Sequence, residues 1–293
     1  MAFNDRLFQA IASRFPTERI DENLVGALWR VLFYALQPSQ PFVMWTRHYR
    51  LWAWPKKGTL TRTVIRRGYW EATLTALFTP HLKPGGFVID AGANFGHFGL
   101  VAAQMVGPAG AVCAFEPHGP SFALLASNIE LNQFSAMKAE RAALSDVNGE
   151  TSIVADSANP GGHSLSGDNV TAAAEVATVP VRTLDAYLAE AYPDRKVDVI
   201  KIDVQGYEAH LIAGAMSTLR RDLPVVFCEI TPAMLHNVGR SEQEILSVFE
   251  KLGYSAVIAW DSANLIEARS FAEIAEACRQ TGGHIDLVLT PPT

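Results

Sequence analysis

A short apolar run that breaks into a glycine-rich turn and resumes as a helix constrains this chain more than any other feature. Residues 86–90 predict a buried strand, residues 91–96 read Ala-Gly-Ala-Asn-Phe-Gly, and an apolar helix is expected to continue through Val106. Gly92 and Gly96 allow backbone conformations and close approaches that a side chain would prevent. The junction predicts a ligand beside the first turn of a helix, where backbone N–H groups attract a carboxylate or phosphate.

From about residue 70 onward, predicted strands and helices alternate. Further strands are expected at 111–115, 141–144, 197–204, 224–230, 255–260 and 285–290, with 150–154 returning on 141–144 and 176–181 extended. This alternation favours an α/β fold with a mainly parallel, doubly wound sheet and helices on both faces.

The first 67 residues differ from the rest in charge and aromatic content. Residues 1–70 hold 11 Lys and Arg against 4 Asp and Glu, together with five of the six tryptophans, whereas the remainder holds 13 against 26. Apolar periodicity predicts helices at 3–15 and 24–36, and residues 42–67 are expected to be helical or irregular. We therefore predict an N-terminal helical cap over 1–67 and a second domain over 68–293.

Three interpretations of this basic, aromatic cap stay open at this point. Its aromatic side chains could dock it on the main domain, or seal a homodimer. Alternatively, arginine, lysine and tryptophan could contact an anionic or lipid-linked acceptor at a membrane surface.

Composition excludes several classes of protein. The 293 residues are 49% hydrophobic and 18% charged, which is typical of a globular chain. A net charge of −6 argues against a nucleic-acid partner. Three cysteines without a Cys-x-x-Cys pair indicate a reducing compartment. The longest apolar stretch, 24–36, is too short to span a bilayer, and the N-terminus lacks a signal-like apolar core, so we expect a cytoplasmic location.

Four acidic residues stand where a predicted strand ends: Asp90, Glu116, Asp203 and Glu229. In a parallel sheet these ends meet at one edge, where ligands bind. The first turn departs from the Gly-x-Gly-x-x-Gly pattern, because Asn94 stands at the second glycine position. A dinucleotide pyrophosphate needs that glycine, so a smaller zwitterionic nucleoside such as S-adenosylmethionine is favoured.

Three residues, Asp90, Asn94 and Glu116, can be matched to parts of such a nucleoside. Asp90 and Asn94 could hold its amino group, while backbone N–H groups receive its carboxylate. Glu116 follows Asp90 by 26 residues, and a carboxylate there accepts two hydrogen bonds from vicinal ribose hydroxyls. A nicotinamide oxidoreductase is a weaker alternative, because the middle glycine is missing.

Several segments, in this order, resemble the FkbM family of S-adenosylmethionine-dependent methyltransferases over about residues 66–230. They are VIDAGANFGHFGL, CAFEP with a downstream SNIELN, TLDAYL, VDVIKIDVQGYEAHLIAGA and PVVFCEI. The resemblance implies a class I methyltransferase (Rossmann-like) fold with a seven-stranded sheet that includes one antiparallel strand. It also implies methyl transfer, usually to a hydroxyl oxygen of a sugar or polyketide.

The resemblance assigns a cofactor-binding role to eight residues. Glu71, in the segment 68–71, matches an acid that reaches the amino-acid end of the cofactor, and Ser145 and Asp146 lie near the expected adenine. The remaining five match the donor loop and the ribose acid: Asp90, Gly92, Asn94, Gly96 and Glu116.

The same resemblance points to the reacting centre. Residues 161–165 match a loop near it, Glu208 matches an acid in the helix after the fourth strand, and Gln205 departs from the glutamate that is common in the family. Asp203 is the first candidate for the catalytic base, because its position faces the methyl group in the resembled fold. His163 is the second, because an imidazole in a Gly/Ser-rich loop would titrate near neutral pH.

Two further features shape the predicted reaction. The Asn/Asp-Pro-Pro-Tyr signature of amine methylation is absent, and Asp203 offers a carboxylate instead. No His, Asp or Glu cluster has metal-ligand spacing, so we expect metal independence. The sequence thus predicts an S-adenosylmethionine-dependent O-methyltransferase acting on a hydroxyl of a sugar, glycolipid or secondary metabolite. The alternatives are a catalytically silent nucleoside-binding module and an N-methyltransferase.

Overall fold

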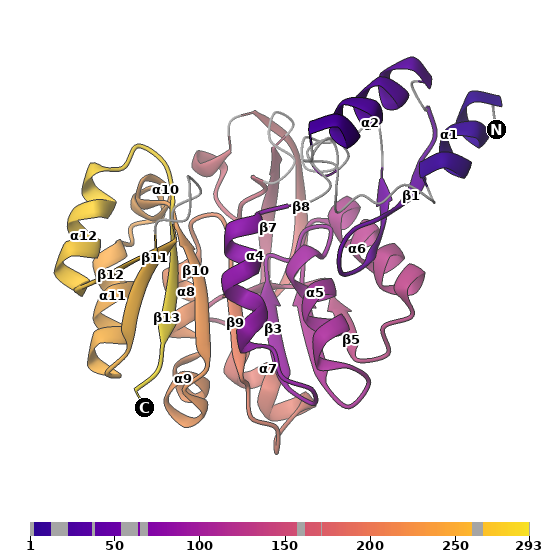
Figure 1. Ribbon diagram of the computed structural model, residues 1–293. Coiled ribbons are helices and arrows are strands. Elements are labelled where there is room, and N and C mark those ends of the chain that lie inside the picture. The colour runs from indigo at the N-terminus through magenta and orange to yellow at the C-terminus, as the bar shows by residue number, and fades with distance from the viewer. Residues whose placement is uncertain are drawn as a thin grey trace.

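A central eight-stranded sheet organises the protein, which we describe from a computed structural model. The structure describes residues 3–12, 23–36, 39–53, 64, 70–156, 162–170, 172–259 and 266–292. From edge to edge the strands are β12 (Ile266–Arg269), β11 (Ser255–Ala259), β13 (Ile285–Thr290), β10 (Val225–Ile230), β9 (Val199–Ile202), β3 (Phe87–Ala91), β4 (Ala111–Phe115) and β5 (Met137–Glu140) (Figure 1).

The direction of these strands confirms the expected fold class. Strands β5, β4, β3, β9 and β10 run parallel, while β13 is antiparallel to both of its neighbours, β10 and β11. Seven strands with one reversed are what the resemblance implies. The eighth strand, β12, was not expected and pairs antiparallel with β11 at the sheet edge.

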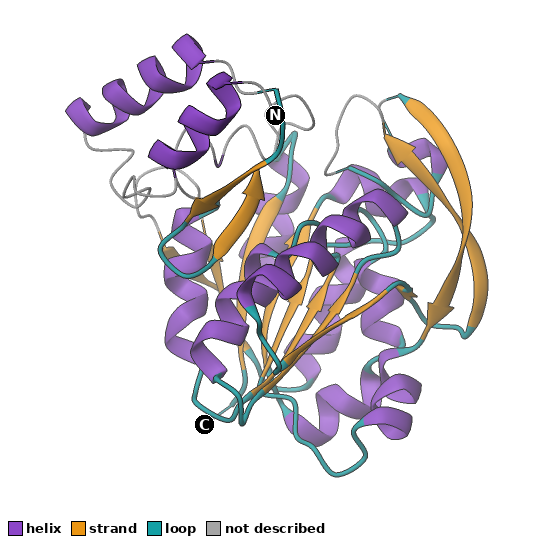
Figure 2. Ribbon diagram, turned by 90° about the vertical axis from the view of Figure 1, so that its right-hand side faces the viewer, coloured by secondary structure: helices purple, strands orange, loops and turns teal. Residues whose placement is uncertain are grey.

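Helices cover both faces of the sheet (Figure 2), and alternation along β3 divides the core between them. Val88 packs on one face, and Phe87 and Ile89 pack on the other. The Val88 face carries α4 (Ala72–Phe78), α5 (His97–Val106) and α6 (Gly119–Asn132). The opposite face carries α7 (Leu184–Ala191), α8 (Glu208–Ala213), α9 (Met216–Asp222), α10 (Pro232–Asn237), α11 (Glu242–Lys251) and α12 (Phe271–Gln280).

A second sheet, in the order β6-β8-β7, lies outside the central one. Its strands are β6 (Ala143–Leu144), β7 (Gly149–Asp156) and β8 (Ala173–Arg182). The assignment of 141–144 to the central sheet, with 150–154 returning on it, was therefore wrong: β6 and β7 both pair with β8. The central sheet uses β5 instead, an edge strand whose only buried residue is Met137, so it lacks the apolar run that marks inner strands.

The N-terminal region contains the two expected helices, α1 (Phe3–Ala12) and α2 (Asn23–Leu36), and an unexpected hairpin. Residues 42–53 form β1 (Phe42–Trp45) and β2 (Arg50–Ala53), because buried and more exposed side chains alternate along both segments. Residues 54–63 and 65–69, with the predicted boundary at 67/68, lie outside the described residues, so the two-domain division stays a prediction. Along the described chain, no helix has the length and apolarity that crossing a bilayer requires.

Asn128 and Asn132 of α6 fasten this hairpin to the main domain. The Trp52 N–H donates to Asn128 Oδ1 over 2.9 Å, and the Arg50 N–H donates to Asn132 Oδ1 over 2.7 Å. The Asn128 side-chain amide also donates to the carbonyl of Phe95, in the glycine-rich turn, over 2.9 Å. Asn128 is fully buried, so it ties the hairpin and the turn to one point of α6.

We predict that Asn128→Ala lowers the free energy of unfolding by about 1–3 kcal/mol, because it leaves buried backbone groups of Trp52 and Phe95 without their partners. Urea denaturation followed by circular dichroism measures this. Ser127→Ala, at an exposed neighbouring position, is the matched control and should stay within about 0.5 kcal/mol of the parent. Equal effects of the two substitutions would contradict the fastening role of Asn128.

Candidate active site

A cavity of about 1090 Å³ opens at the carboxyl ends of β3, β4, β9 and β10 and the beginning of β13. Seven of the ten predicted site residues line it: Glu71, Asp90, Gly92, Asn94, Glu116, His163 and Asp203. Gly96, Ser145 and Asp146 do not. Of the predicted motif residues, Gly68, Tyr69 and Gly161 lie outside the described residues.

Gly92 brings the glycine-rich turn into contact with the end of β9. A Cβ atom at this position would lie 1.7 Å from the carbonyl oxygen of Asp203, a distance that no real contact allows. Gly92 also has φ of +80°, in the region that favours glycine. Gly96 precedes α5 with φ of +99°, and its role is therefore to shape the turn rather than to line the cavity.

Glu116, directly after β4, accepts a hydrogen bond from the glycine-rich turn that follows β3. Its Oε2 accepts the backbone N–H of Asn94 over 2.8 Å, and its Oε1 accepts the backbone N–H of His118 over 2.8 Å. Burial raises the pKa of Glu116 to about 7, although these two hydrogen bonds oppose that shift. Each carboxylate oxygen keeps a second lone pair, so Glu116 retains the acceptors that two ribose hydroxyls need.

Asp90 and Glu71 complete the acidic wall on this side of the cavity. Asp90 Oδ2 accepts the backbone N–H of Gly99, in the first turn of α5, over 2.8 Å. Burial raises the pKa of Asp90 to about 6 and that of Glu71 to about 7. Glu71 has φ of +43° and Asn94 has φ of +50°, conformations that non-glycine residues adopt mainly at constrained, often functional, positions.

Ser145 and Asp146 lie behind the wall that was expected to receive the adenine. The Ser145 N–H donates to the carbonyl of Arg182, and its carbonyl oxygen packs against Gly214. Leu144, the preceding residue, lines the cavity instead. An adenine in this part of the cavity would therefore meet the apolar Leu144 side chain.

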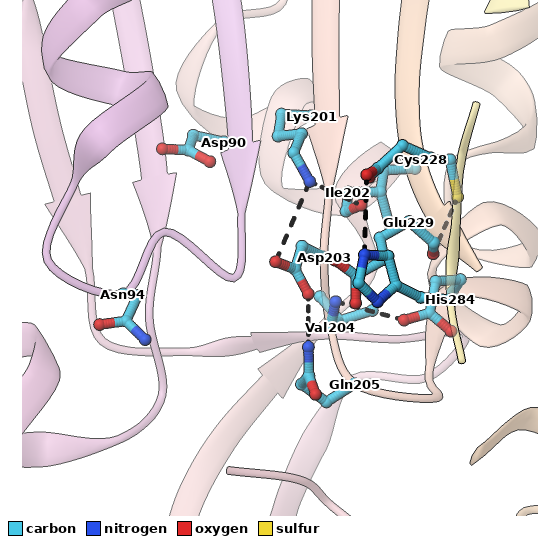
Figure 3. Close-up of polar contacts among 12 residues, drawn as sticks. Asp90, Asn94, Lys201, Ile202, Asp203, Val204, Gln205, Cys228, Glu229 and His284 are labelled. Atoms are coloured by element: carbon cyan, nitrogen blue, oxygen red, sulfur yellow. Dashed lines mark hydrogen bonds and ion pairs between the residues drawn. The ribbon is translucent and has the colours of Figure 1, made fainter. Parts of the chain in front are cut away.

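Asp203 faces the cavity from the end of β9 and is held by two neighbours (Figure 3). The Gln205 side-chain amide donates to Asp203 Oδ1 over 2.6 Å, and Lys201 Nζ lies 4.0 Å from Asp203 Oδ2. Glu208 supports the turn that follows: its Oε1 accepts the backbone N–H groups of Val204 and Gly206. The residue that departs from the family pattern, Gln205, thus donates a hydrogen bond to the candidate base.

Lys201 is a cavity-lining residue that the sequence interpretation overlooked. It is 1% exposed, and its ammonium donates only weakly to the Ile202 carbonyl, over 3.4 Å. Burial acts to lower the pKa of Lys201, but nearby carboxylates outweigh it and raise that pKa; they belong to Asp203, Glu71, Asp286 and Glu229. The signal was available, because a lysine inside an apolar parallel strand requires buried partners.

Two of those partners come from the antiparallel pair β10–β13. Glu229 and Asp286 are directly paired across the two strands, so two carboxyl groups meet at the cavity wall. Burial and the neighbouring Asp203 raise the pKa of Glu229 well above its ordinary value. His284 Nε2 lies 3.8 Å from Asp286 Oδ2 at the outer side of this pair. Asp286 was missed because only the reversed direction of β13 brings the beginning of that strand to this edge.

His163 lines the cavity, but not in the state expected of a base. Its Nδ1 accepts the backbone N–H of Asp156 over 2.9 Å, which leaves the proton on Nε2. Burial and the adjacent His118 ring, 3.7 Å away between centroids, lower the pKa of His163 to about 4. Titration near neutral pH was therefore a wrong expectation, and His163 is arranged to donate a hydrogen bond.

The carboxyl groups of the cavity lie along several strand ends. Among the described residues, no three His, Cys, Asp or Glu are grouped so as to bind a metal. Metal independence stays a prediction. The glycine-rich turn, the start of α5 and Glu116 lie together along this cavity.

A family model for the FkbM methyltransferase domain matches residues 90–256, the stretch that runs from the Asp90 strand end past β10 and into β11. The chain belongs to the FkbM methyltransferase family. It is 28% identical over 171 residues to Methyltransferase sdnD of Sordaria araneosa, an alignment that covers 47% of this chain and 66% of that protein. It is 25% identical over 144 residues to Methyltransferase 1 of Beauveria bassiana (strain ARSEF 2860), covering 44% of this chain and 57% of that protein.

The chain therefore spans less than two thirds of either relative. A crystal structure of a methyltransferase FkbM from Methylobacillus flagellatus KT shares 12% identity and a TM-score of 0.41 with it, over 98% of this chain and 58% of that one. The FkbM family uses S-adenosylmethionine as its methyl donor, which agrees with the residues around the glycine-rich turn.

We predict that Glu116→Gln changes how stability depends on pH. Because the pKa of Glu116 rises from 4.5 to about 7 on folding, the stability that its protonated form provides is full below pH 4.5 and is lost as pH rises through 7. Glutamine does not titrate. The free energy of unfolding of the variant, relative to the parent, should therefore rise by about 2.5 kcal/mol between pH 5 and pH 8. Urea denaturation of the ligand-free proteins tests this, and parallel pH profiles would contradict it.

Proposed function

We propose that this protein is an S-adenosylmethionine-dependent O-methyltransferase that modifies a hydroxyl of a sugar, glycolipid or secondary metabolite. The observation that carries the proposal is the contact between Gly92 and Asp203. Through this contact, the partly exposed Asp203 carboxylate and the glycine-rich turn line the same cavity. A binding module without catalysis has no need of such a group facing its ligand.

Different residues of this chain would contact different parts of the donor. Glu116 would accept the two ribose hydroxyls, while Asp90, Asn94 and Glu71 would surround the amino-acid end. Leu144 would pack against the adenine. When bound, the donor supplies an electrophilic methyl group on a positively charged sulfur.

Asp203 would act as the base for the acceptor. Asp203 would take the proton of the acceptor hydroxyl as the acceptor oxygen bonds to the methyl carbon. The donor would supply that methyl group and would leave as a neutral thioether. A hydroxyl is far less acidic than a carboxylic acid, so proton removal and attack must occur together. Lys201 and the Gln205 amide would fix the Asp203 carboxylate, and alignment of the acceptor would supply much of the rate.

The acidic wall indicates a neutral acceptor rich in hydroxyl groups. Asp203, Glu229 and Asp286 accept hydrogen bonds from hydroxyls, whereas an acidic group would be repelled there. The same wall would attract an ammonium group, which makes N-methylation the second candidate. A nucleic-acid partner is disfavoured because phosphates would meet this negative cavity. We also propose a reducing, cytoplasmic location, since Cys113, Cys228 and Cys278 are buried free thiols.

Calorimetric titration with S-adenosylhomocysteine, with NADH as the control ligand, tests the donor site. Saturable binding of the former alone supports the proposal, and binding of NADH alone would revive the oxidoreductase alternative. Release of S-adenosylhomocysteine from S-adenosylmethionine with neutral polyols, amines and glycolipids then separates the remaining candidates. Turnover with amines but not with hydroxyl compounds would favour N-methylation, and donor binding without turnover would favour the silent module.

We predict that Asp203→Asn reduces turnover by about 10²- to 10⁴-fold, because asparagine cannot take the acceptor proton. Affinity for S-adenosylhomocysteine and the free energy of unfolding should change little. Asp194→Asn, at an exposed position outside the cavity, is the matched control. Full turnover in the Asp203 variant would exclude this residue as the base.

We further predict that Gln205→Glu moves the acidic limb of the kcat/KM profile to higher pH by about one unit or more. A glutamate there would place a second carboxyl within hydrogen-bond distance of Asp203, and two such groups hold one proton between them. Gln205→Leu removes the same hydrogen bond without adding charge. It should lower turnover while leaving the profile in place, and an equal pH shift in both variants would refute the explanation.

A further inference from the structure

The helix α2 is apolar on two opposite faces. Trp29 is fully buried on its inner face, where its ring lies 5.5 Å from that of Phe8. Leu24, Leu28 and Val31 recur at helical spacing on the outer face, yet they are 73%, 57% and 67% exposed. A helix that is apolar all round is normally covered on every side, so this outer stripe requires a partner.

The surroundings of the stripe indicate what that partner is. Tyr34 on the same helix is 55% exposed. Amphipathic aromatic side chains of this kind are enriched where a protein meets the polar boundary of a lipid layer. A folded protein partner would not require them to be accompanied by a net positive charge.

That positive charge is present. Arg6, Arg30 and Arg47 are exposed in the described part of residues 1–53. The one acid described there, Asp5, is 5% exposed and accepts hydrogen bonds from Ser39. The described part of this region therefore exposes both apolar and cationic side chains, while residues 71–293 carry 26 Asp and Glu against 13 Lys and Arg.

The position of α2 relates this surface to the cavity. Arg30 of α2 lines the cavity. The stripe residues nearest to it in sequence, Leu28 and Val31, are exposed instead. Figure 1 shows α2 on the same side of the molecule as the carboxyl ends of the parallel strands, where the cavity opens. A surface that receives α2 would therefore lie close to the cavity entrance.

We propose that the outer face of α2 binds an anionic membrane surface, with Leu24, Leu28 and Val31 inserted at the level of the headgroups and Tyr34 at the boundary. The arginines attract the anionic lipids, and the acidic main domain is repelled from them, so the N-terminal region is the part of the protein that faces the membrane. A second copy of the chain is a poorer occupant, because a two-fold contact through this face would bring like-charged arginines together. This inference does not rest on the proposed reaction.

Flotation with vesicles tests the proposal. The full chain is mixed with vesicles of phosphatidylcholine alone or of phosphatidylcholine with phosphatidylglycerol, at low and at physiological salt. The parent protein should float with the anionic vesicles, more so at low salt, because exposed charges are screened within about 8–10 Å at higher ionic strength. Leu28→Glu/Val31→Glu should weaken this binding roughly tenfold or more, since it places charge at the inserted positions.

The matched control is Val147→Glu/Val176→Glu, which introduces the same two charges at exposed valines (57% and 64%) of the main domain. It should float like the parent protein. Both variants should bind S-adenosylhomocysteine as the parent does, which shows that they are folded and keeps this test separate from that of the reaction.

Three results would overturn the proposal. The parent protein could stay unbound to anionic vesicles at low salt, or the α2 variant could float as well as the parent. Alternatively, sedimentation could show a dimer that Leu28→Glu/Val31→Glu dissociates without any vesicle binding, in which case the face joins two copies of the chain.

Discussion

The approach of two strand ends at Gly92 is the constraint on which the site depends. With no side chain at that position, the turn after β3 closes against the carbonyl of Asp203, where a Cβ atom would overlap it. The glycine-rich turn and Asp203 thereby share one wall of one cavity, as the proposed reaction requires. In-line displacement requires this proximity, because the reacting atoms must meet in a fixed orientation.

Charge is the second organising element of the cavity. The buried Lys201 ammonium lies among acids from β9, β10, β13 and the turn before α4, and these acids keep its pKa raised despite burial. Several carboxyl groups, including Glu71 and Glu116, have raised pKa values because burial disfavours their charged forms.

The N-terminal region is integrated with this site rather than attached to it loosely. The hairpin donates a hydrogen bond to Asn128, and Asn128 donates one to the carbonyl of Phe95 in the glycine-rich turn. The hydroxyl of Tyr49, also in the N-terminal region, lies 2.7 Å from Nδ1 of His97 at the start of α5. Docking on the main domain and exposure of an apolar face are therefore both present, on opposite sides of the same region. Of the interpretations open from sequence, docking is confirmed, while a membrane contact is what we propose for the outer face.

The sequence by itself determined the parts of the site that are local in the chain. Asp90, Gly92 and Asn94 lie within one turn, and Glu116 ends the next strand, so strand and turn patterns sufficed to find them. Only the tertiary structure decided the rest, because it depends on strand direction and packing. The reversal of β13 pairs Asp286 with Glu229, the N–H of Asp156 fixes the protonation of His163, and packing against Gly214 keeps Ser145 out of the cavity. These contacts join residues far apart in sequence or depend on loop geometry, and no local pattern encodes either.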